Sequence, residues 1–409
     1  MNEVFSRLKA HSLVKEGLVF LKEDDERTLE EQVELTLVPA PSLMEEKKAQ
    51  VFKAKLERYG LNNIEEDRHG NVFGIRHGNG NGPRIFVCAH LDTVFPEGTE
   101  IHATKKEGKV YAPGISDDGR GLAAVLSVLR AFEQTNIQTE GDIIFGATVG
   151  EEGLGDLKGV KGLFQDRKDI DAFISLEPGT PEEITYIGTG SHRYHVTYKG
   201  SGGHSFGDFG IPSATHALGR AISKIADLET PTEPKTTFTV GTITGGTSVN
   251  TIAQEASMMV DLRSNLQTEL VKLEEKVLAI FREAAEAENN RWKSSKTSIE
   301  VTMELVGNRP AGTQSPTASI VQTAMAANES LGLQPVLSEA MSTDSNVPIS
   351  LGIPAVTLGA GGDCGGIHTL EEYFDPKDAY LGPQVLFLTI LGIVGVHGEV
   401  LPLLERGEE

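Results

Sequence analysis

The sequence is poor in cysteine, in positive charge and in long apolar runs, and each shortage excludes a class of protein. Its two cysteines, Cys88 and Cys364, cannot form a disulfide framework, and they lack the CxxC spacing of structural zinc or redox sites. This cysteine usage predicts a reducing, cytoplasmic location. With 37 Lys and Arg against 59 Asp and Glu, the net charge of -22 argues against nucleic-acid partners and against a basic membrane patch.

No segment has the length of a transmembrane helix, so we expect no membrane partner. The longest apolar run, residues 385–396, is well short of the roughly 18 to 20 residues that cross a bilayer, and we interpret it as a buried core helix. Charged residues interrupt the N-terminal segment, which predicts no signal peptide. The composition, with 39% hydrophobic and 23% charged residues, is that of a globular protein, and 409 residues indicate two or three domains.

Short apolar runs alternate with helical patterns over much of the chain. The runs 85–89, 142–149, 172–176 and 354–358 are predicted to be buried strands. Between the first two, apolar residues recur from Leu122 to Phe132 with the spacing of one helix face. Strands that alternate with helices predict an α/β fold, in which helices flank a mixed or mostly parallel sheet.

A different pattern occupies about residues 190–306. Four β-rich stretches and two helical stretches follow one another there in the order β-α-β-β-α-β, which is the order of a ferredoxin-like α+β domain. The limits of this region fall in glycine-rich or polar segments, so we interpret it as a domain inserted into the first one. We therefore predict a larger domain from residues 1–188 and 308–409, and an inserted domain from residues 189–307.

Acidic residues and histidines directly follow several of the predicted strands. They occur in the segments His90-Leu91-Asp92, Ser116-Asp117-Asp118-Gly119, Gly150-Glu151-Glu152-Gly153, Glu177-Pro178 and Gly366-Ile367-His368-Thr369. In open α/β sheets, ligands bind at the carboxyl ends of the strands. We therefore expect these side chains to form one functional site in the larger domain.

The residue types of these segments are those of a metal site. Two histidines and three carboxylates form a nitrogen and oxygen ligand set that suits zinc, with manganese or cobalt as competitors. The number of candidates suggests two divalent ions that share a carboxylate. Because side chains two residues apart in an extended segment point the same way, the carboxylate of Asp92 can accept the ring proton of His90. In the Glu151-Glu152 pair, one carboxylate can bind metal while the other acts as general base.

The order of these pieces resembles that of a known family. Residues 88–94 (CAHLDTV), 114–119 (GISDDG), 150–153 (GEEG), 177–178 (EP) and 202–205 (GGHS) are similar to motifs of the co-catalytic zinc metallopeptidases. This family includes glutamate carboxypeptidase, peptidase T, acetylornithine deacetylase and succinyl-diaminopimelate desuccinylase. The resemblance extends from about residue 35 to residue 395, and it rests on the ordered set of motifs more than on any one of them.

The resemblance implies a zinc-exopeptidase-like fold and a role for each residue of the site. The implied ligands of two zinc ions are His90, Asp117, Glu152, Glu177 and His368, with Asp117 bridging the pair. Glu151 would be the general base, and Asp92 would orient His90. Members of the family often hold the peptide bond that follows the bridging acid in the cis form, so we expect a cis bond after Asp117.

The inserted domain resembles the family's lid and dimerisation domain, which implies a homodimer formed through it. The resemblance implies that His204 reaches the active site of the other subunit and stabilises the oxyanion there. Asn250, Arg263 and Arg309 match polar positions that hold substrate, often by a carboxylate, and the guanidinium fork of arginine binds two oxygens of such a group.

Most of these candidates also have a purely structural interpretation. Asp is a favoured helix N-cap, and we expect Asp118 to cap the following helix while Asp117 binds metal. The other structural alternatives are a strand cap for His90, a solvated charge pair for Glu151 and Glu152, a turn residue for Glu177 and for His204, and an exposed strand residue paired with a carboxylate of its own domain for Arg263.

The preferred interpretation of function is a di-zinc exopeptidase that hydrolyses small peptides, with a metal-bridging water and Glu151 as general base. Residues 369–373 (TLEEY) resemble the peptidase members of the family. At the fourth ligand position, however, dipeptidases and tripeptidases tend to have aspartate, whereas carboxypeptidases and deacylases tend to have glutamate, as at Glu177. An N-acyl amino acid deacylase, an amidohydrolase, is therefore the second interpretation. A non-catalytic peptide or metabolite binder is the third, and it is disfavoured because a binder has no need of both Asp117 and Glu151.

Overall fold

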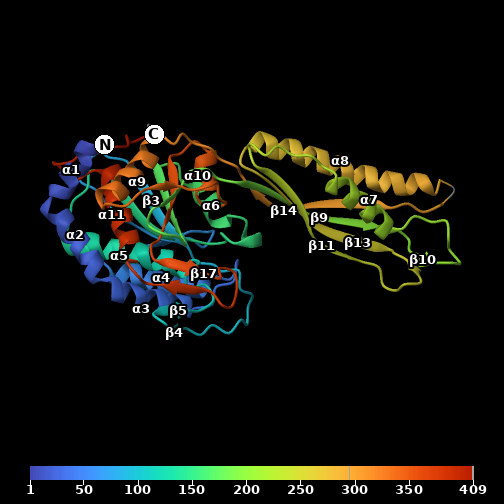
Figure 1. Cartoon of the computed structure of the whole chain (residues 1–409), viewed down its shortest axis with the longest axis horizontal. Coiled ribbons are helices and arrows are strands. Elements are labelled where there is room, and N and C mark those ends of the chain that lie inside the picture. The colour runs from blue at the N-terminus through green and yellow to red at the C-terminus, as the bar shows by residue number, and fades with distance from the viewer. Residues whose placement is uncertain (294, 408–409) are drawn as a thin grey trace. The chain divides into compact units, whose positions relative to one another are not determined.

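The computed structural model describes residues 1–293 and 295–407, which divide into two compact units (Figure 1). The first unit consists of Met1–Gly188 and Thr313–Glu409, and the second consists of Thr189–Gly312. The sequence predicts that the inserted domain ends at residue 307. The second unit continues to Gly312 because its last strand, β14 (Glu300–Arg309), still pairs with β9 (Gly190–Lys199) at Arg309 and Ser191.

The first unit is built on an eight-stranded mixed sheet. In sheet order its strands are β1 (Glu65–Glu66), β2 (Val72–Arg76), β6 (Asp142–Thr148), β3 (Arg84–His90), β7 (Ala172–Glu177), β16 (Ala355–Gly359), β8 (Glu183–Thr185) and β15 (Val336–Leu337). The four central strands, from β6 to β16, are parallel to one another, whereas β2 and β8 pair with them antiparallel. The carboxyl ends of the parallel strands therefore meet along one edge of the sheet.

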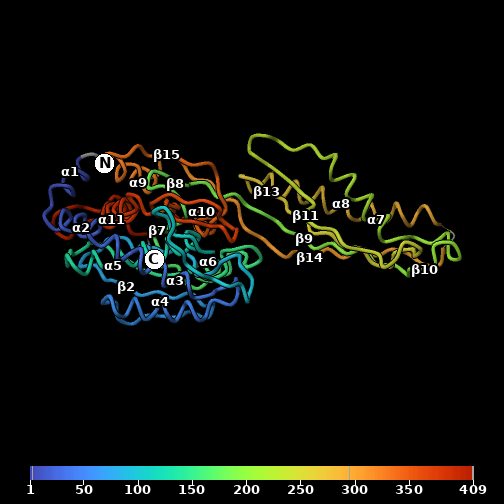
Figure 2. The backbone as a smooth tube through the Cα atoms, turned by 60° about the horizontal axis from the view of Figure 1, so that its bottom comes forward, coloured from blue at the N-terminus to red at the C-terminus, as the bar shows by residue number. Residues whose placement is uncertain are grey.

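Helices cover both faces of this sheet. They are α1 (Asn2–Ala10), α2 (Ser12–Glu23), α3 (Asp25–Thr36), α4 (Glu46–Arg58), α5 (Gly119–Thr135), α6 (Lys158–Asp166), α9 (Ser319–Ser330), α10 (Asn346–Ser350) and α11 (Leu381–Val394). Alternate residues of β3 face opposite sides: Val87 belongs to a core with α5 and α11, and Phe86 to a core with α6 and α10. At the margin of the sheet, α4 packs beside β2 (Figure 2).

The predicted α/β architecture is confirmed. The four predicted buried strands are the parallel strands β3, β6, β7 and β16. The helix predicted around Leu122 and Phe132 lies within α5, and the apolar run at residues 385–396 overlaps the buried helix α11. Among the described residues, no helix combines the length and the apolar character needed to cross a membrane.

A small second sheet in the first unit joins segments that are remote in sequence. Its strands, in sheet order, are β17 (Asp363–Gly365), β18 (Tyr373–Asp375), β5 (Lys109–Tyr111) and β4 (Thr104–Lys106). The antiparallel pairing of β18 with β5 places residues 373–374 beside residues 110–111. The chain just before Asp117 is thereby held next to the chain just after His368.

The long elements of the second unit follow one another in the order β9, α7 (Ala214–Ala226), β11 (Thr236–Gly245), β13 (Glu255–Ser264), α8 (Gln267–Arg291) and β14, with the two-residue strands β10 (Gly203–His204) and β12 (Thr251–Ile252) between them. Its four long strands form an antiparallel sheet in the order β11-β13-β9-β14, and α7 and α8 pack on one face of it (Figure 1). This is the predicted β-α-β-β-α-β order of a ferredoxin-like domain. The last strand was predicted at residues 297–303, but it begins at Glu300 and runs to Arg309, past a bulge between Leu305 and Gly307.

Candidate metal centre

Asp117 lies between the two histidines of the predicted site. Its Oδ1 is 2.9 Å from Nε2 of His90, and its Oδ2 is 3.1 Å from Nε2 of His368. His90 ends β3, Asp117 lies just before α5, and His368 lies in the loop between β17 and β18. One carboxylate thus contacts, through its two oxygens, imidazoles that stand 278 positions apart in the chain.

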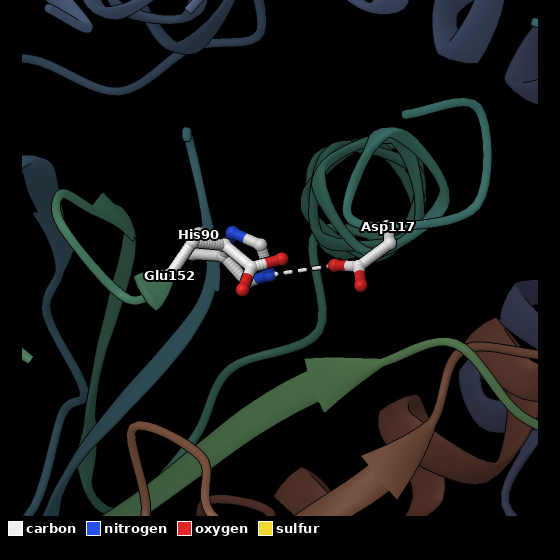
Figure 3. A group of neighbouring side chains, drawn as sticks. All are labelled: His90, Asp117 and Glu152. Atoms are coloured by element: carbon white, nitrogen blue, oxygen red, sulfur yellow. Dashed lines mark hydrogen bonds and ion pairs between the residues drawn. The ribbon is translucent and has the colours of Figure 1, made fainter. Parts of the chain in front are cut away.

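A glutamate stands beside each histidine. Oε1 of Glu152 is 3.0 Å from Nε2 of His368, and Oε2 of Glu177 is 3.9 Å from Nε2 of His90. His90, Asp117 and Glu152 are buried, and one ligand atom from each lies within 4.8 Å of the others, so the three form a group able to hold a metal ion (Figure 3). The structure thus brings all five predicted ligand residues into one site.

The parallel strands place these residues. His90 and Glu177 end the adjacent strands β3 and β7, and Glu152 follows β6, the neighbour of β3 on the other side. A hydrogen bond from the backbone N of Leu91 to O of Thr148, at 2.8 Å, continues the pairing of β3 and β6 beyond His90. The site therefore lies at the carboxyl edge of the sheet, as the sequence predicted.

Asp92 contacts His90 through its backbone carbonyl and through its carboxylate. Nδ1 of His90 is 3.0 Å from the backbone carbonyl O of Asp92 and 3.5 Å from its carboxylate Oδ1. The Asp92 carboxylate also accepts the backbone N–H groups of Glu151 and Glu152, both at 2.9 Å, and the hydroxyl of Ser42 at 2.7 Å. The carboxylate thus lies beside the His90 ring, and its role as acceptor of the ring proton stays a prediction. Asp92 orients the Glu151-Glu152 segment as well as His90.

Asp118 forms the predicted N-cap. Its Oδ1 accepts the backbone N–H of Gly121 at 2.9 Å, and its Oδ2 accepts that of His90 at 3.1 Å. Its carboxylate is used by the two backbone donors, while that of Asp117 faces the histidines. The peptide bond between Asp117 and Asp118 is cis, as predicted.

The carboxylates of the site strongly perturb one another. Burial raises the pKa of Glu152 to about 7, and the negative charge of Asp117 raises it further. Burial also raises the pKa of Glu177 well above its usual value. The hydrogen bond with Asp117 raises the pKa of His368 to about 9. Although burial lowers the pKa of His90, its hydrogen bond with Asp117 raises it well above 6.5.

Burial is the largest cause of the raised pKa values of the two glutamates, and the neighbouring negative charges of the site raise these values further. Protons on the imidazoles or on the glutamates reduce this negative charge. A divalent cation does the same when it replaces those protons, since it needs neutral imidazoles and ionised carboxylates as ligands. The donor set of imidazole nitrogens and carboxylate oxygens without thiolate fits zinc, manganese or cobalt.

Comparison with known proteins agrees with this geometry. The chain matches the sequence profile of Peptidase family M20/M25/M40 over residues 86–392. The chain belongs to this family. It is therefore a metal-dependent hydrolase, and the resemblance inferred from the motifs is confirmed at the level of the family.

Two curated relatives align with most of the length of this chain. The uncharacterized protein YqjE of Bacillus subtilis is 28% identical over 366 residues, which cover 85% of this chain and 93% of the relative. A succinyl-diaminopimelate desuccinylase of Nitrosospira multiformis is 25% identical over 356 residues, which cover 82% and 90%. The similarity thus includes both units.

Solved structures share the fold. The aminopeptidase PepT from Bacillus cereus has a TM-score of 0.72 at 24% identity, with 90% of this chain and 98% of that chain covered. A tripeptidase from Staphylococcus aureus has a TM-score of 0.74 at 24% identity, with 90% and 97% covered. At these identities the likeness establishes the M20/M25/M40 fold.

The other predicted site residues of this M20/M25/M40 chain lie in the second unit. His204 and Asn250 are exposed and adjacent: β10 (Gly203–His204) pairs with β12 (Thr251–Ile252), and the backbone N of Ser205 donates to O of Asn250 at 3.0 Å. Nδ1 of His204 accepts the backbone N–H groups of Phe206 and Gly207, at 3.3 and 3.2 Å. A ring nitrogen that accepts carries no proton, so the proton of the neutral imidazole is on Nε2.

The two arginines predicted to bind substrate, Arg263 and Arg309, differ in exposure: Arg263 is half-buried and Arg309 is buried. Nε of Arg263, on β13, donates to Oδ2 of Asp261 at 2.7 Å. This ion pair with a carboxylate of its own domain is the structural alternative that the sequence left open for Arg263. Arg309, near the end of β14, is buried, with 4% of its surface exposed. The substrate-binding roles of Arg263 and Arg309 stay predictions.

Three residues of the first unit support the site and had no predicted role. The hydroxyl of Ser42 donates to Asp92, and Oε1 of Glu45 accepts the backbone N–H of Gly150 at 3.0 Å. Glu372 accepts three backbone N–H groups of the segment that leads to Asp117. No sequence pattern marks Ser42 or Glu45, whereas Glu372 lies in the peptidase-like segment 369–373 without a role having been assigned to it.

Proposed function

We propose that this chain is a di-zinc exopeptidase that hydrolyses amide bonds of small peptides. The observation that carries the proposal is the position of Asp117, whose two carboxylate oxygens face His90 on one side and His368 on the other. A carboxylate placed between two imidazoles, with a further glutamate beside each, is the ligand arrangement that a two-metal site requires.

Asp117 would be shared by two metal ions. His90 and Glu177 would complete one ligand group, and Glu152 and His368 the other. When bound, the ions supply Lewis-acid polarisation of a carbonyl and acidification of a water. Zinc fits the donor set first, with cobalt or manganese as competitors.

Glu151 would act as the general base and then as the general acid. It is buried, and the hydrogen bond from its backbone N to Oδ1 of Asp92 fixes its place beside Glu152. Its carboxylate would take a proton from the attacking water as the oxygen bonds to the scissile carbonyl carbon. The same proton would pass to the amine nitrogen as the carbon–nitrogen bond breaks, so that Glu151 ends the cycle ionised.

The second unit would serve as lid and dimerisation domain. We propose that, in a homodimer, His204 of one subunit donates its Nε2 proton to the oxyanion formed in the site of the other. Acceptance of two backbone N–H groups by Nδ1 supports this role, because it leaves the proton on the nitrogen that points away from the turn. Asn250, Arg263 and Arg309 would hold the substrate, with the arginines suited to a carboxylate.

A second candidate function is hydrolysis of N-acyl amino acids. It is favoured by Glu177, where the resemblance associates glutamate with carboxypeptidases and deacylases, and by the name of the desuccinylase relative. The peptidase proposal is favoured by the peptidase-like segment 369–373 and by the family name. Both substrates contain an amide bond, so the same site residues serve either one. We further propose a cytoplasmic location, which the two free cysteines support.

A matched substrate panel distinguishes these functions. The zinc-loaded or cobalt-loaded protein is incubated with unblocked di- and tripeptides and with N-acyl amino acids, each with and without a chelator. Chelator-sensitive release from unblocked peptides is the expected result. Cleavage confined to N-acyl substrates would assign the chain to the deacylases, and no cleavage at all would favour a binder.

The Glu151→Gln variant tests the mechanism separately from the substrate. An amide of the same size cannot take the proton of water, so turnover should fall by about 10² to 10⁴-fold while bound metal stays at the wild-type level. Glu100→Gln is the matched control, since Glu100 is exposed and lies outside the site. Turnover unchanged in Glu151→Gln would remove this residue from the mechanism.

A further inference from the structure

The carboxylate of Glu372 is fully buried and is bonded to backbone rather than to side chains. Its Oε2 accepts the N–H of Gly114 at 3.0 Å, and its Oε1 accepts the N–H groups of Ser116 at 2.8 Å and of Asp117 at 3.0 Å. The exposed fraction of Glu372 is 0%. Among the described residues, no lysine or arginine forms an ion pair with it, so the three N–H groups are what stabilises this buried charge.

The position of Glu372 in the chain links it to His368, another predicted ligand of the metal centre. It follows His368 by four residues and directly precedes β18. Its backbone carbonyl O accepts the N–H of Ala112 at 3.1 Å, and the hydroxyl of Ser116 donates to O of Tyr373 at 3.1 Å. The segment that carries His368 is therefore joined to the segment that carries Asp117 by side-chain and backbone bonds.

The segment before Asp117 is held from two sides. Glu372 accepts N–H groups of residues 114–117, while Nε2 of Gln32, on α3, donates to the carbonyl O of Ile115 at 2.7 Å. With its backbone N–H bonded to Glu372, Asp117 has little freedom to rotate or shift. Its two carboxylate oxygens can then face His90 and His368 at the same time.

We propose that Glu372 is a positioning residue of the metal centre, which fixes the backbone of Asp117 relative to His368 so that one carboxylate serves both ligand groups. The inference rests on the proposed two-metal function and adds to it the residue that holds the shared ligand in place. Glu372 itself faces backbone and not the metal-binding atoms. Its effect on the site passes entirely through Asp117 and the 114–117 segment.

The test uses the full-length Glu372→Gln variant and its neighbour Glu371→Gln as control. Glutamine has the shape of glutamate, but its NH₂ group must face at least one of the three N–H donors, so one or two of the bonds are lost. Glu371 is exposed and its substitution changes the charge by the same amount. Glu372→Asp is the second variant, because it keeps the charge but is too short to reach all three donors.

The readouts are cobalt titration, the visible absorption spectrum of the cobalt-loaded protein, and thermal unfolding with cobalt and with chelator. We expect Glu372→Gln to weaken cobalt binding on the order of 10 to 100-fold, as removal of residues that orient ligands does, and to change the spectrum. The melting temperature should fall more in cobalt than in chelator. Glu371→Gln should match the wild type in all three measurements.

Three outcomes would overturn the inference. One is wild-type cobalt affinity and spectrum in both Glu372 variants. Another is an equal fall in melting temperature with and without cobalt at unchanged affinity, which would assign Glu372 to fold stability alone. The third is failure of both variants to fold in the presence of chelator, which would likewise assign Glu372 to fold stability. If the wild type itself binds no cobalt, the proposed two-metal function fails, and this result is distinct from a failure confined to Glu372.

Discussion

The two units of this chain present their candidate functional residues in opposite ways. In the first unit, His90, Asp117 and Glu152 have only 2%, 8% and 7% of their surface exposed, and each contacts another candidate. In the second unit, His204 and Asn250 lie on a short exposed strand pair. The same family resemblance pointed to both sets, yet only the first set forms a site by itself.

Buried candidates limit the possible function of a site more than exposed candidates do. Buried polar groups must be bonded or charge-balanced, so the contacts among His90, Asp117 and Glu152 already limit what the site can bind. Exposed groups are satisfied by water and carry no such requirement. The role of His204 therefore depends on what binds it from outside its unit, and experiments on substrate or on a second subunit are needed to establish it.

The strongest test of the first unit is the Asp117→Asn variant. The amide replaces one carboxylate oxygen with an NH₂ group, so Asp117 can no longer accept at both oxygens, and the shared ligand is lost. We expect kcat/KM to fall on the order of 10³-fold or more, the scale of removing an essential catalytic group, and metal content to fall with it. Metal analysis and peptide hydrolysis check this, with the exposed Asp227→Asn as control. Full metal content in Asp117→Asn would show that Asp117 is not a ligand.

His204→Ala tests the second unit and should leave the first unit unchanged. Loss of one oxyanion donor is expected to lower kcat by about 10² to 10³-fold, while metal content stays at the wild-type level. Mixing His204→Ala with Asp117→Asn subunits should restore about a quarter of the wild-type activity, since half of randomly mixed dimers would contain one intact site. Absence of restored activity in proven heterodimers would rule out action of His204 across subunits.

Much of the fold was predictable because burial leaves a pattern in the sequence. The parallel strands β3, β6, β7 and β16 are buried on both faces and therefore appear as continuous apolar runs. The small strands β4, β5, β17 and β18 were not predicted, since segments of three residues are too short to carry a periodic signal. The pairing of β18 with β5, which joins the two halves of this sheet, depends on contacts between residues more than 250 positions apart.

The site was predictable in part, for a related physical reason. Side chains that bind metal must be histidines or acids, and such residues stand out where they follow an apolar strand, as His90 and Glu177 do. Glu372 acts on backbone N–H groups, which every residue except proline has, so no residue type at positions 114–117 reveals its partner. The bonds of the Asp92 carboxylate to the backbone of Glu151 and Glu152 were missed for the same reason.

A buried ion cluster of the first unit extends the comparison to stability. Glu31, on α3, contacts Arg130 of α5, accepts the hydroxyl of Tyr59 at 2.7 Å and accepts the ammonium of Lys55 at 3.0 Å. Although burial raises the pKa of Glu31, the charge of Arg130 and the hydrogen bond of Tyr59 lower it below 4.5 overall. A lowered pKa in the folded state means that the ionised group stabilises the fold above the unfolded pKa.

The Glu31→Gln variant should therefore lose stability only where Glu31 is ionised. At pH 7 we expect the free energy of unfolding to fall by about 1.5 to 3 kcal/mol, the worth of hydrogen bonds to a charged group. The difference from the wild type should shrink as the pH drops below 4.5 and through the lower pKa of the folded state. Denaturant unfolding at a series of pH values measures it. A difference that is constant with pH would contradict the assigned role of the charge.

The smallest expected effect separates the two interpretations of Arg263. Its guanidinium already has a partner in Asp261, so a carboxylate of the substrate would compete with that ion pair or share it. If Arg263 binds substrate, Arg263→Gln should raise KM by roughly 10-fold with little change in kcat, because uniform binding energy is lost. A peptide with an amidated C-terminus serves as the control, since it lacks the carboxylate and should show no such change. Equal KM values for the variant and the wild type on both peptides would show that Arg263 is a strand residue whose only role is its pairing with Asp261. The comparison between the buried candidates of the first unit and the exposed candidates of the second would then depend on His204 and Asn250.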